Sequence, residues 1–339
     1  MKAVRMHRFG PPNILVYEDV PTPHPGPDQI LIRVEAATVN YSDVLRRRND
    51  VYPFPTPLPF VPGGEVAGVV EALGDGVTGP PIGTPVFAIA GSGGDGGYAQ
   101  YALANAAGVI PIPPGLGVDA AASLVIAGST AALLLTDAAG LGRGESVLIP
   151  AAAGGVGSYA VQIAKLLGAS PIIAAVSTAE KQAAARRLGA DAVVDYTQPT
   201  WPAEVRALTS GRGVDVILEG TGGDVFAQSL TCLAPFGRLV VYGRSGGASL
   251  SLSADAIDRM FYDPSPNQSI INFNLGLWFG LRPERAVAAL QRLIGFVVEG
   301  KVDVQVGHVL PLSRAREAHL LLEERRSVGK IILKPWEDA

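Results

Sequence analysis

The clearest alternation of apolar and polar stretches lies in the middle of the chain. Ser146–Ala152 is a short apolar run with the length of a buried strand, and Val156–Leu167 carries apolar residues at helical spacing until Gly168 interrupts it. The pattern then repeats, with a helical segment over 179–188 and further strand-like runs at Pro171–Val176, Ala192–Tyr196, Val214–Gly220 and Arg238–Gly243. Strands that alternate with helices predict a parallel, doubly wound α/β sheet.

The first 120 residues follow a different pattern. Short apolar runs between proline- and glycine-rich turns predict an irregular all-β unit, with one helix over 40–48 and strands at Lys2–Met6, Ile14–Val20, Gln29–Ala37, Val66–Leu73 and Pro85–Ile89. A helical segment rich in alanine and leucine, 120–139, leads into the central sheet. The end of the chain resumes the character of the beginning. We therefore expect a β-rich domain of residues 1–122 plus 270–339 and a nucleotide-binding domain of residues 123–269.

A glycine cluster separates the first predicted strand of the central sheet from its helix. Gly154, Gly155 and Gly157 stand there around Val156, and Ala152 occupies the first slot of a G-x-G-x-x-G motif. A dinucleotide site needs such residues because the turn is tight, the backbone approaches a pyrophosphate, and the helix packs closely on its strand. The helix N-terminus then attracts the phosphates. An ordinary strand-to-helix turn is the alternative, and the repeated strand–helix alternation favours the nucleotide site.

The end of the second strand of the central sheet indicates which dinucleotide binds. Sites that prefer NAD carry an acidic residue there, which bonds the ribose 2′-OH. Here the strand ends in Ser177 and Thr178, Lys181 follows closely, and the first carboxylate is Glu180. Hydroxyls and a lysine suit a 2′-phosphate, because they hydrogen-bond and neutralise its charge. We therefore expect NADPH, with a merely solvated Lys181 as the alternative.

Composition narrows the function classes. The chain has 339 residues, 48% of them hydrophobic, and 27 basic against 31 acidic residues give a net charge of −4. This mixed balance favours neither nucleic acid nor an anionic membrane as a partner. The one cysteine, Cys232, excludes an internal disulfide and fits a reducing compartment. No apolar run reaches membrane-spanning length and the first residues lack a signal-peptide pattern, so we expect a cytoplasmic protein.

Motifs spread over the whole chain resemble those of the medium-chain dehydrogenase/reductase superfamily. They are VNYSDVLRRRNDVYP at 39–53, VPGGEVAGVVEALGDGV at 61–77, AGSTAALLL at 127–135, AAAGGVG at 151–157 and VGKIIL at 328–333. Within the superfamily the chain looks most like the zinc-independent quinone oxidoreductases of the zeta-crystallin group. The resemblance implies a Rossmann domain that binds NADP and a GroES-like, β-rich domain that carries the substrate site.

The positions that hold catalytic zinc in the related alcohol dehydrogenases carry other residues here. The matching positions are Asn40, Gly64 and Ile126, none of which offers a usual zinc ligand, and one cysteine cannot build the four-cysteine structural site. The four histidines are scattered without ligand spacing, and we interpret them as surface or packing residues: His7, His24, His308 and His319. We expect no metal site.

An enzyme without zinc lacks the Lewis acid that polarises a carbonyl oxygen. Side-chain donors must then stabilise the negative charge on the substrate oxygen, which is easiest when conjugation spreads that charge. The resemblance therefore implies an NADPH-dependent quinone or enone reductase. Tyr52 and Asn40 are the expected catalytic residues: in similar reductases the matching tyrosine faces the nicotinamide, and a neutral phenol can donate to an oxyanion. The alternative is that Tyr52 only shapes the loop beside Pro53 and Pro55.

The resemblance also implies which residues bind the cofactor. Ser177, Lys181 and Tyr196 are expected around the 2′-phosphate, and the glycine cluster at the pyrophosphate. From the end of the chain, Arg326 and Lys330 are expected to reach the cofactor phosphates, unless Lys330 is simply exposed. The residues expected around the nicotinamide half are Thr130, Gly220, Tyr242, Gly243 and Ser245.

Two other functions fit the sequence. A 2-enoyl thioester reductase has a similar N-x-x-D…YP pattern, and the arginines at 46–48 would then bind a coenzyme A or carrier-protein phosphate, although such a run more often forms a solvated helix face. The other is a cofactor-binding protein without catalysis, a structural or regulatory partner, against which the intact Asn40 and Tyr52 argue. The expected partners are a small-molecule quinone or enone and a second copy of the chain, because similar proteins commonly form homodimers.

Overall fold

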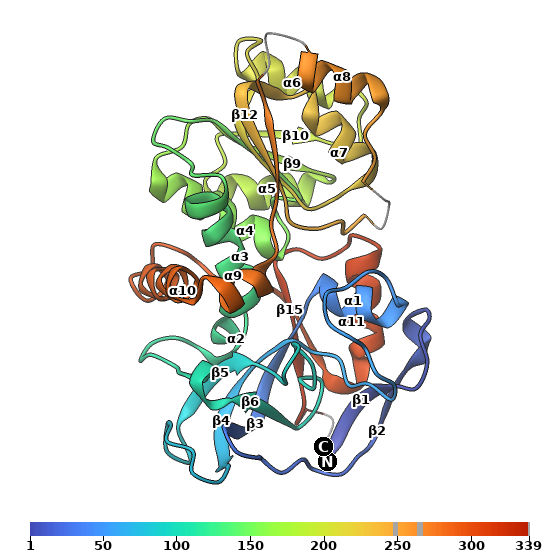
Figure 1. Ribbon diagram of the computed structural model, residues 1–339, viewed down its shortest axis with the longest axis vertical. Helices are drawn as coiled ribbons and strands as arrows, with labels where there is room; N and C mark the ends of the chain where they lie inside the picture. Colours follow the sequence, from blue (N-terminus) through green and yellow to red (C-terminus); the bar gives the residue numbers. More distant parts are fainter. Residues whose placement is uncertain (247–249, 263–266, 338–339) are drawn as a thin grey trace. The chain divides into compact units, whose positions relative to one another are not determined.

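The chain divides into two compact units. The computed structural model describes residues 1–246, 250–262 and 267–337. The β unit contains Met1–Ile126 with Val304–Ala339, and the α/β unit contains Ala127–Asp303. In Figure 1 the β unit carries the blue and red ends of the colour scale, and the α/β unit carries the green to orange middle.

The α/β unit contains the doubly wound sheet expected from the central pattern. Its six strands run parallel in the order β10-β9-β8-β11-β12-β13. The bounds are β8 Val147–Pro150, β9 Ile172–Val176, β10 Ala192–Asp195, β11 Val214–Glu219, β12 Leu233–Val241 and β13 Ser269–Asn272. The strand order reverses on either side of β8, so the switch point of the sheet lies at the end of this strand. The expected Rossmann fold is confirmed.

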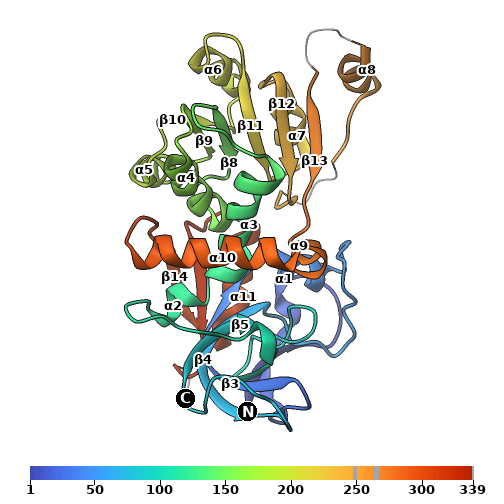
Figure 2. The same cartoon turned by 60° about the vertical axis from the view of Figure 1, so that its left-hand side comes forward.

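Helices cover this sheet, as Figure 2 shows from another side. α6 and α7 contribute Trp201, Val205 and Phe226 to an apolar cluster with strand residues such as Leu148 and Ile173, so these two helices cover one face. α4 and α5 contact each other. α4 also contacts β8 and β9, and α5 contacts β9 and β10. The bounds are α4 Gly155–Leu167, α5 Ala179–Leu188, α6 Trp201–Leu208, α7 Gly223–Leu230, α8 Ala254–Tyr262, α9 Leu275–Leu281 and α10 Pro283–Val298.

The chain returns to the β unit at Val304, later than the boundary at residue 270 that we expected. β13 pairs with β12 in parallel, from Ser269 opposite Arg238 to Asn272 opposite Val241, and therefore belongs to the α/β sheet. α10 packs on α3 (Ser129–Leu133) within the same unit. β13 reads Ser-Ile-Ile-Asn, with two apolar residues between polar ones, so it lacks the longer apolar run by which β8 and β10 are recognised. The sequence therefore placed the return too early.

The helical segment expected over 120–139 is present but irregular. α3 (Ser129–Leu133) is α-helical, and π-helical stretches, Leu124–Gly128 and Leu134–Ala138, precede and follow it. π-helical turns are rare and frequently mark functional sites. Thr130, which we expect near the nicotinamide, lies in α3 and is 6% exposed.

The β unit is organised on a second, largely antiparallel sheet. Six strands follow the order β14-β15-β3-β4-β5-β7, and β6 pairs with β3. The last strand lies beside β3, so the end of the chain completes this sheet. The bounds are β3 Gln29–Val39, β4 Glu65–Leu73, β5 Pro85–Ile89, β6 Tyr101–Asn105, β7 Ile110–Pro111, β14 Val306–Pro311 and β15 Lys330–Lys334, with a separate hairpin of β1 Lys2–Met6 and β2 Leu15–Asp19 and helices α1 Tyr41–Arg48, α2 Val118–Ala121 and α11 Ala315–Glu323.

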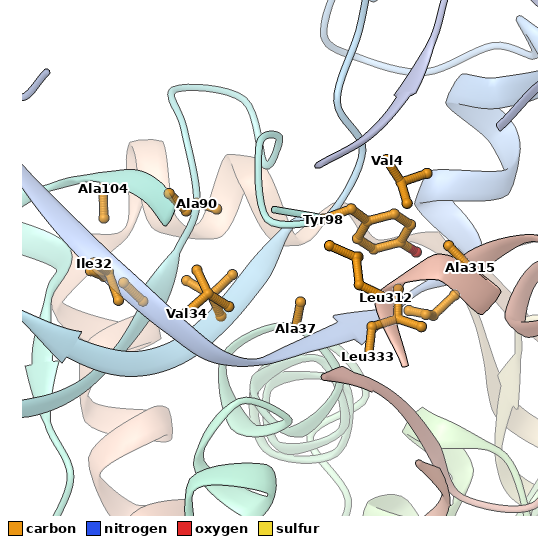
Figure 3. Packing of buried hydrophobic residues seen from close by; sticks show 14 of the residues in the cluster. Val4, Ile32, Val34, Ala37, Ala90, Tyr98, Ala104, Leu312, Ala315 and Leu333 are labelled. Atoms are coloured by element: carbon orange, nitrogen blue, oxygen red, sulfur yellow. The ribbon is translucent and has the colours of Figure 1, made fainter. Parts of the chain in front are cut away.

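Alternating apolar residues of β3 build the core of the β unit. Ile30, Ile32 and Val34 are fully buried because side chains two apart in a strand lie on the same face of the sheet. Figure 3 shows Ile32 and Val34 along β3, and the ring of Tyr98 near Leu312. The core therefore joins the first strands of the chain to the segment before α11.

A chain of buried polar side chains connects α1 to α11 beside this core. Arg47 donates through Nε to His319 Nδ1 at 3.2 Å. Because an arginine can only donate, His319 Nδ1 accepts, and its Nε2–H donates to the Tyr98 phenol oxygen at 3.2 Å. Tyr98 in turn donates to Asp43 Oδ2, also at 3.2 Å. The hydrogen bonds thus run in one direction, from Arg47 through His319 and Tyr98 to Asp43.

Burial sets the protonation states in this chain of side chains. Burial and the charge of Arg47 lower the pKa of His319 to about 3, so the imidazole is neutral at physiological pH. Burial raises the pKa of Asp43 to about 6, against the hydrogen bonds from the Asn40 and Gly63 amides and from Tyr98. At neutral pH this series of hydrogen-bonded side chains therefore ends at Asp43, an ionised carboxylate that accepts three hydrogen bonds.

Arg47→Met should lower the free energy of unfolding by about 3 kcal/mol, because it leaves His319 Nδ1 and the Gly10 carbonyl without this donor and removes a buried charge from beside Glu323. Equilibrium urea unfolding measures the change. Arg48→Met is the matched control, because Arg48 contacts the same Glu323 with 38% of its side chain exposed and should contribute less than about 1 kcal/mol. Equal losses in the two variants would contradict the stabilising role of the buried chain.

Candidate functional site

The glycine cluster lies where the sequence predicts it, between β8 and α4. Ala151 follows β8 with a left-handed backbone (φ 53°), and the Gly154 N–H donates to the Ala151 carbonyl at 2.8 Å, which closes the turn. Gly154 is then the N-cap of α4, and no side chain caps that helix end. The first amides of α4 therefore have no intrahelical partner, and the helix dipole adds positive charge there. This end of α4 is suited to bind phosphate.

Gly157 fits closely against the same turn. A Cβ at this position would lie 2.4 Å from the Ala151 carbonyl oxygen and 2.6 Å from Ala152 Cα, so only glycine allows α4 to approach the turn this closely. Ala152, which replaces the first glycine of the motif, lies outside the left-handed region, and its methyl group causes no backbone strain. The residues present therefore fit the pyrophosphate of a dinucleotide.

The residues expected around a 2′-phosphate lie at the ends of the paired strands β9 and β10. Ser177 follows β9, and Thr178 caps α5 by accepting the Lys181 N–H at 3.3 Å. Tyr196 follows β10 and is 8% exposed, and its N–H donates to the Val176 carbonyl at 3.3 Å. The structure therefore brings Ser177, Lys181 and Tyr196 to the same edge of the sheet, and β9 is followed by two hydroxyl residues where an NAD site has a carboxylate.

The ends of β11 and β12 bring together four more expected residues. The Tyr242 N–H donates to the Glu219 carbonyl at 3.0 Å, and the Ser245 N–H donates to the Gly220 carbonyl at 2.8 Å. A Cβ on Gly220 would lie 2.4 Å from Tyr242 Cζ, so the ring packs directly on this glycine. A Cβ on Gly243 would lie 3.5 Å from the Gly220 carbonyl oxygen. Gly220, Tyr242, Gly243 and Ser245 thus form one surface at the carboxyl edge of the sheet.

Glu219 organises this edge and was not predicted from the sequence. It is fully buried, and Oε1 accepts the N–H groups of Thr221 at 2.6 Å and Gly222 at 2.9 Å. Its other oxygen accepts the Ser229 hydroxyl at 3.1 Å. These donors hold the turn after β11 in a fixed shape. A glutamate at a strand end gives no sequence signal for such a role, because acidic residues at that place usually face solvent.

In the β unit, Asn40 belongs to a buried polar cluster around Glu65. The Lys330 ammonium donates to Asn40 Oδ1 at 2.7 Å and to Glu65 Oε1 at 3.0 Å. Asn40 Nδ2 lies 3.2 Å from both Thr38 Oγ1 and Glu65 Oε1, and the Thr38 hydroxyl donates to Glu65 Oε1 at 2.6 Å. Glu65 Oε2 accepts the Ile126 N–H at 2.8 Å. Glu65 is fully buried and Lys330 is 3% exposed, so the two charges neutralise each other inside the unit.

This cluster bears on the expected roles of Lys330 and Asn40. Lys330 is buried and its ammonium is bonded to Asn40 and Glu65, so it is not simply exposed, and its expected role at the cofactor phosphates stays a prediction. The Asn40 oxygen accepts from Lys330. Thr38 Oγ1 and Glu65 Oε1 lie only 2.6 Å apart, so a single amide hydrogen of Asn40 faces both, and the expected role of Asn40 as a donor to the substrate stays a prediction. Arg326, the other residue expected at the phosphates, is exposed and pairs with Glu324 at 2.7 Å, and its role toward the cofactor stays a prediction.

Tyr52 lies in the loop after α1 and is half-buried. Arg46 Cζ lies 5.2 Å from the centroid of its ring, and the Phe54 ring centroid lies 6.0 Å away. Burial and the negative charge of Asp43 raise the pKa of Tyr52 above its ordinary value of 10.0, and Arg46 and a hydrogen bond to the Ser42 side chain act in the opposite direction. The phenol is therefore protonated at neutral pH and can donate a hydrogen bond.

The three consecutive arginines of α1 do not form a solvated helix face. Arg46 is 2% exposed and Arg47 is fully buried, and both donate to groups within the β unit. The side chain of Arg48 is 38% exposed and pairs with Glu323. Two of the three residues proposed from the sequence for a thioester phosphate are therefore inaccessible to one.

The positions that match the zinc ligands of related enzymes carry side chains that do not bind zinc, and Gly64 there is buried beside Ile126. In the described parts of the chain, no group of three or more His, Cys, Asp or Glu side chains could hold a metal ion. Cys232 is buried, and burial raises the pKa of its thiol to about 12. Among the described helices, none is long and apolar enough to cross a membrane.

A glycine-rich turn before an uncapped helix, at the switch point of a doubly wound parallel sheet, defines a dinucleotide-binding protein. Known families agree with this class: the zinc-binding dehydrogenase family matches residues 155–260, and the alcohol dehydrogenase GroES-like domain matches residues 26–114. The chain belongs to the medium-chain dehydrogenase/reductase superfamily, in its quinone oxidoreductase group, which confirms the resemblance seen in the motifs.

Relatives match over nearly the whole chain. A quinone oxidoreductase of Pseudomonas aeruginosa is 32% identical over 98% of this chain and 99% of its own length. A 2-haloacrylate reductase of a Burkholderia species is 34% identical over 98% of this chain and 98% of its own length. The crystal structure of an Escherichia coli quinone oxidoreductase complexed with NADPH has a TM-score of 0.90 at 28% identity, covering 99% of this chain and 100% of that one.

Gly157→Ala should weaken the affinity for NADPH, the cofactor expected from the sequence, by about tenfold. The added methyl group costs about 1–3 kcal/mol in strain and pushes α4 away from the turn. This shift displaces the first amides of α4, which are expected to bind the phosphates, and so weakens the affinity. Isothermal titration calorimetry measures the dissociation constant. Gly295→Ala in α10 is the control, because a Cβ there meets no atom within 4 Å. An unchanged affinity in Gly157→Ala would show that the turn does not bind the cofactor.

Proposed function

We propose that this chain transfers hydride from NADPH to a quinone or an α,β-unsaturated carbonyl, without a metal ion. The observation that carries the proposal is the uncapped N-terminus of α4 behind the glycine turn, which fits a pyrophosphate. Relatives named as a quinone oxidoreductase and as a 2-haloacrylate reductase, and an NADPH complex of similar fold, make the chain an NADPH oxidoreductase. A haloacrylate is itself an α,β-unsaturated acid, which agrees with the proposed substrate class.

The α/β unit supplies the cofactor site. The amides of Gly155, Val156 and Gly157 would hold the pyrophosphate, and Ser177, Lys181 and Tyr196 would surround the 2′-phosphate. Thr130 in α3 and the surface at the ends of β11 and β12, from Gly220 to Ser245, would receive the nicotinamide half. When bound there, NADPH supplies a hydride to the conjugated carbon of the substrate.

The β unit supplies the hydrogen-bond donor. The Tyr52 phenol, neutral at pH 7, would donate to the substrate oxygen on which negative charge develops. Conjugation already spreads this charge, so one well-placed donor suffices where related enzymes use zinc. Asn40, fixed by Lys330 and Glu65, sets the N-terminus of α1, and α1 leads into the Tyr52 loop. Its second amide hydrogen, which does not face Thr38 or Glu65, would be a further donor to the substrate.

The alternatives from the sequence receive less support. A 2-enoyl thioester reductase needs cations for a phosphate, and Arg46 and Arg47 are buried and bonded within the β unit. A protein without catalysis has no need of a protonated, half-buried phenol at Tyr52. The expected homodimer stays a prediction, with β13 as an edge strand of the α/β sheet.

The proposed function is tested by measuring NADPH oxidation against a panel of acceptors. We expect turnover with a benzoquinone and with a small enone or 2-chloroacrylate, and at least tenfold less efficient turnover with an enoyl-CoA. Rates should be the same after dialysis against a chelator. Fastest turnover of the enoyl-CoA would favour the thioester alternative, and loss of activity that zinc restores would contradict the metal-free mechanism.

Lys181→Ala should weaken the affinity for NADPH by about tenfold or more and leave the affinity for NADH unchanged, because only NADPH carries the 2′-phosphate that the ammonium neutralises. Calorimetric titration of both cofactors measures this. Lys165→Ala, an exposed lysine near the end of α4, is the control and should change neither constant. A wild-type protein that binds NADH more tightly than NADPH would overturn the assignment.

Tyr52→Phe should lower kcat for an enone by about 10²–10³, since this is the usual cost of removing one oxyanion donor. Quinones accept hydride more readily, so their kcat should fall less, and NADPH affinity should not change. Tyr262→Phe, in which the lost hydroxyl comes from a side chain that is 81% exposed, is the control. If kcat for every acceptor stays within about twofold of the wild type, Tyr52 only shapes its loop.

A further inference from the structure

Arg46 has the environment of a residue built to hold Tyr52. Its guanidinium lies over two rings, with Cζ 4.1 Å from the Phe60 centroid and 5.2 Å from the Tyr52 centroid. An arginine over an aromatic face is attracted by the ring quadrupole, and the attraction grows as water is excluded. Arg46 is 2% exposed, so water is excluded and both attractions are strengthened.

The nitrogens of the same guanidinium bind two loops. Nε donates to Thr56 Oγ1 at 3.1 Å and Nη2 to the Pro55 carbonyl at 2.8 Å, which fixes the segment directly after Tyr52. Nη1 donates to the carbonyls of Gly93 at 2.9 Å and Gly94 at 3.0 Å. These glycines lie in a loop that also packs on the Tyr52 segment, since a Cβ on Gly93 would lie 3.5 Å from Phe54 Cβ.

The backbone of the loop that carries Tyr52 has few contacts of its own. Val51 is 87% exposed and Phe54 is 41% exposed, and neither lies in a helix or strand. Residues that neither pack nor pair cannot fix a side chain by themselves. The Tyr52 phenol is hydrogen-bonded to the Ser42 side chain, while the Arg46 guanidinium lies over the ring and binds the backbone that follows it. Arg46 therefore holds both the ring and its loop.

We propose that Arg46 is a positioning residue that fixes the Tyr52 phenol for donation to the substrate oxygen, and this rests on the proposed function of Tyr52. Arg46 does not bind substrate or cofactor phosphate in this proposal. The plane of its guanidinium lies over two aromatic rings, and its nitrogens donate to groups of the β unit. Its positive charge against the ring also favours a more polarised O–H group, which strengthens the phenol as a donor. A lysine in this place would keep the charge and lose the planar fork.

The test is a double-mutant cycle with Arg46→Gln and Tyr52→Phe. Arg46→Gln should lower kcat for an enone by about 10-fold to 10²-fold, the usual cost of misplacing a catalytic group by about 1 Å, with a smaller effect on quinone reduction. In the Tyr52→Phe background the same change should lower kcat by less than about twofold, because the group it positions is gone. Arg46→Lys should fall between the wild type and Arg46→Gln. Arg48→Gln on the same helix is the control and should leave kcat unchanged.

A second measurement is independent of turnover. In protein labelled with ¹³C at the tyrosine Cζ and free of cofactor, the resonance lost in Tyr52→Phe identifies Tyr52. This resonance should shift or broaden in Arg46→Gln while those of the other tyrosines stay in place. If Arg46→Gln does not fold, Thr56→Val removes one of the four hydrogen bonds and enters the same cycle.

The outcomes separate the two proposals. A kcat loss that persists undiminished in the Tyr52→Phe background, or a Tyr52 resonance that does not respond, would overturn the role of Arg46 and leave that of Tyr52 intact. If Tyr52→Phe alone has no effect on any acceptor, the proposed function of Tyr52 fails first and the role of Arg46 falls with it.

Discussion

One buried carboxylate, Glu65, holds the polar interior of the β unit together. It accepts from Lys330, Asn40 and Thr38 on one oxygen and from the Ile126 backbone on the other. These partners come from the start of β15, the junction of β3 and α1, and the last residue of the first segment of the unit. A buried carboxylate deprived of its partner cation costs several kcal/mol, so segments far apart in the sequence must assemble around it.

α1 transmits this order to the candidate site. The Asn40 N–H donates to Asp43 Oδ2 at 2.8 Å, which sets the first turn of this eight-residue helix. Two turns are then enough to direct Arg46 toward the Tyr52 loop and Arg47 toward α11. The helix therefore connects a buried ion pair to the loop that carries Tyr52. Asp43, Arg46 and Arg47 face inward because each has fixed hydrogen-bond partners there.

Local signals predicted the α/β unit, and distant contacts explain what the sequence missed. The glycine turn and apolar strands are read from neighbouring residues, so Ser146–Ala152 corresponds to β8 at Val147–Pro150. Lys330, by contrast, meets Asn40 across 290 positions, and no local pattern reveals that a lysine is buried. The interpretation of the three arginines of α1 as a solvated face or a phosphate site was wrong for the same reason, because the acceptors of Arg46 and Arg47 lie in distant segments. β13 was not predicted because its two isoleucines stand between polar residues and form no longer apolar run.

Burial decides which side chain of the hydrogen-bonded series from Arg47 to Asp43 takes up a proton first as the pH falls. In water an imidazole binds a proton well before a carboxylate does. Inside the unit this order is reversed: burial raises the pKa of Asp43 to about 6, while burial and Arg47 lower the pKa of His319 to about 3. Mild acidity therefore protonates Asp43 and leaves His319 neutral, and His319 Nδ1 continues to accept the hydrogen bond from Arg47. The protein has inverted the proton affinities of two side chains joined by a single tyrosine hydroxyl.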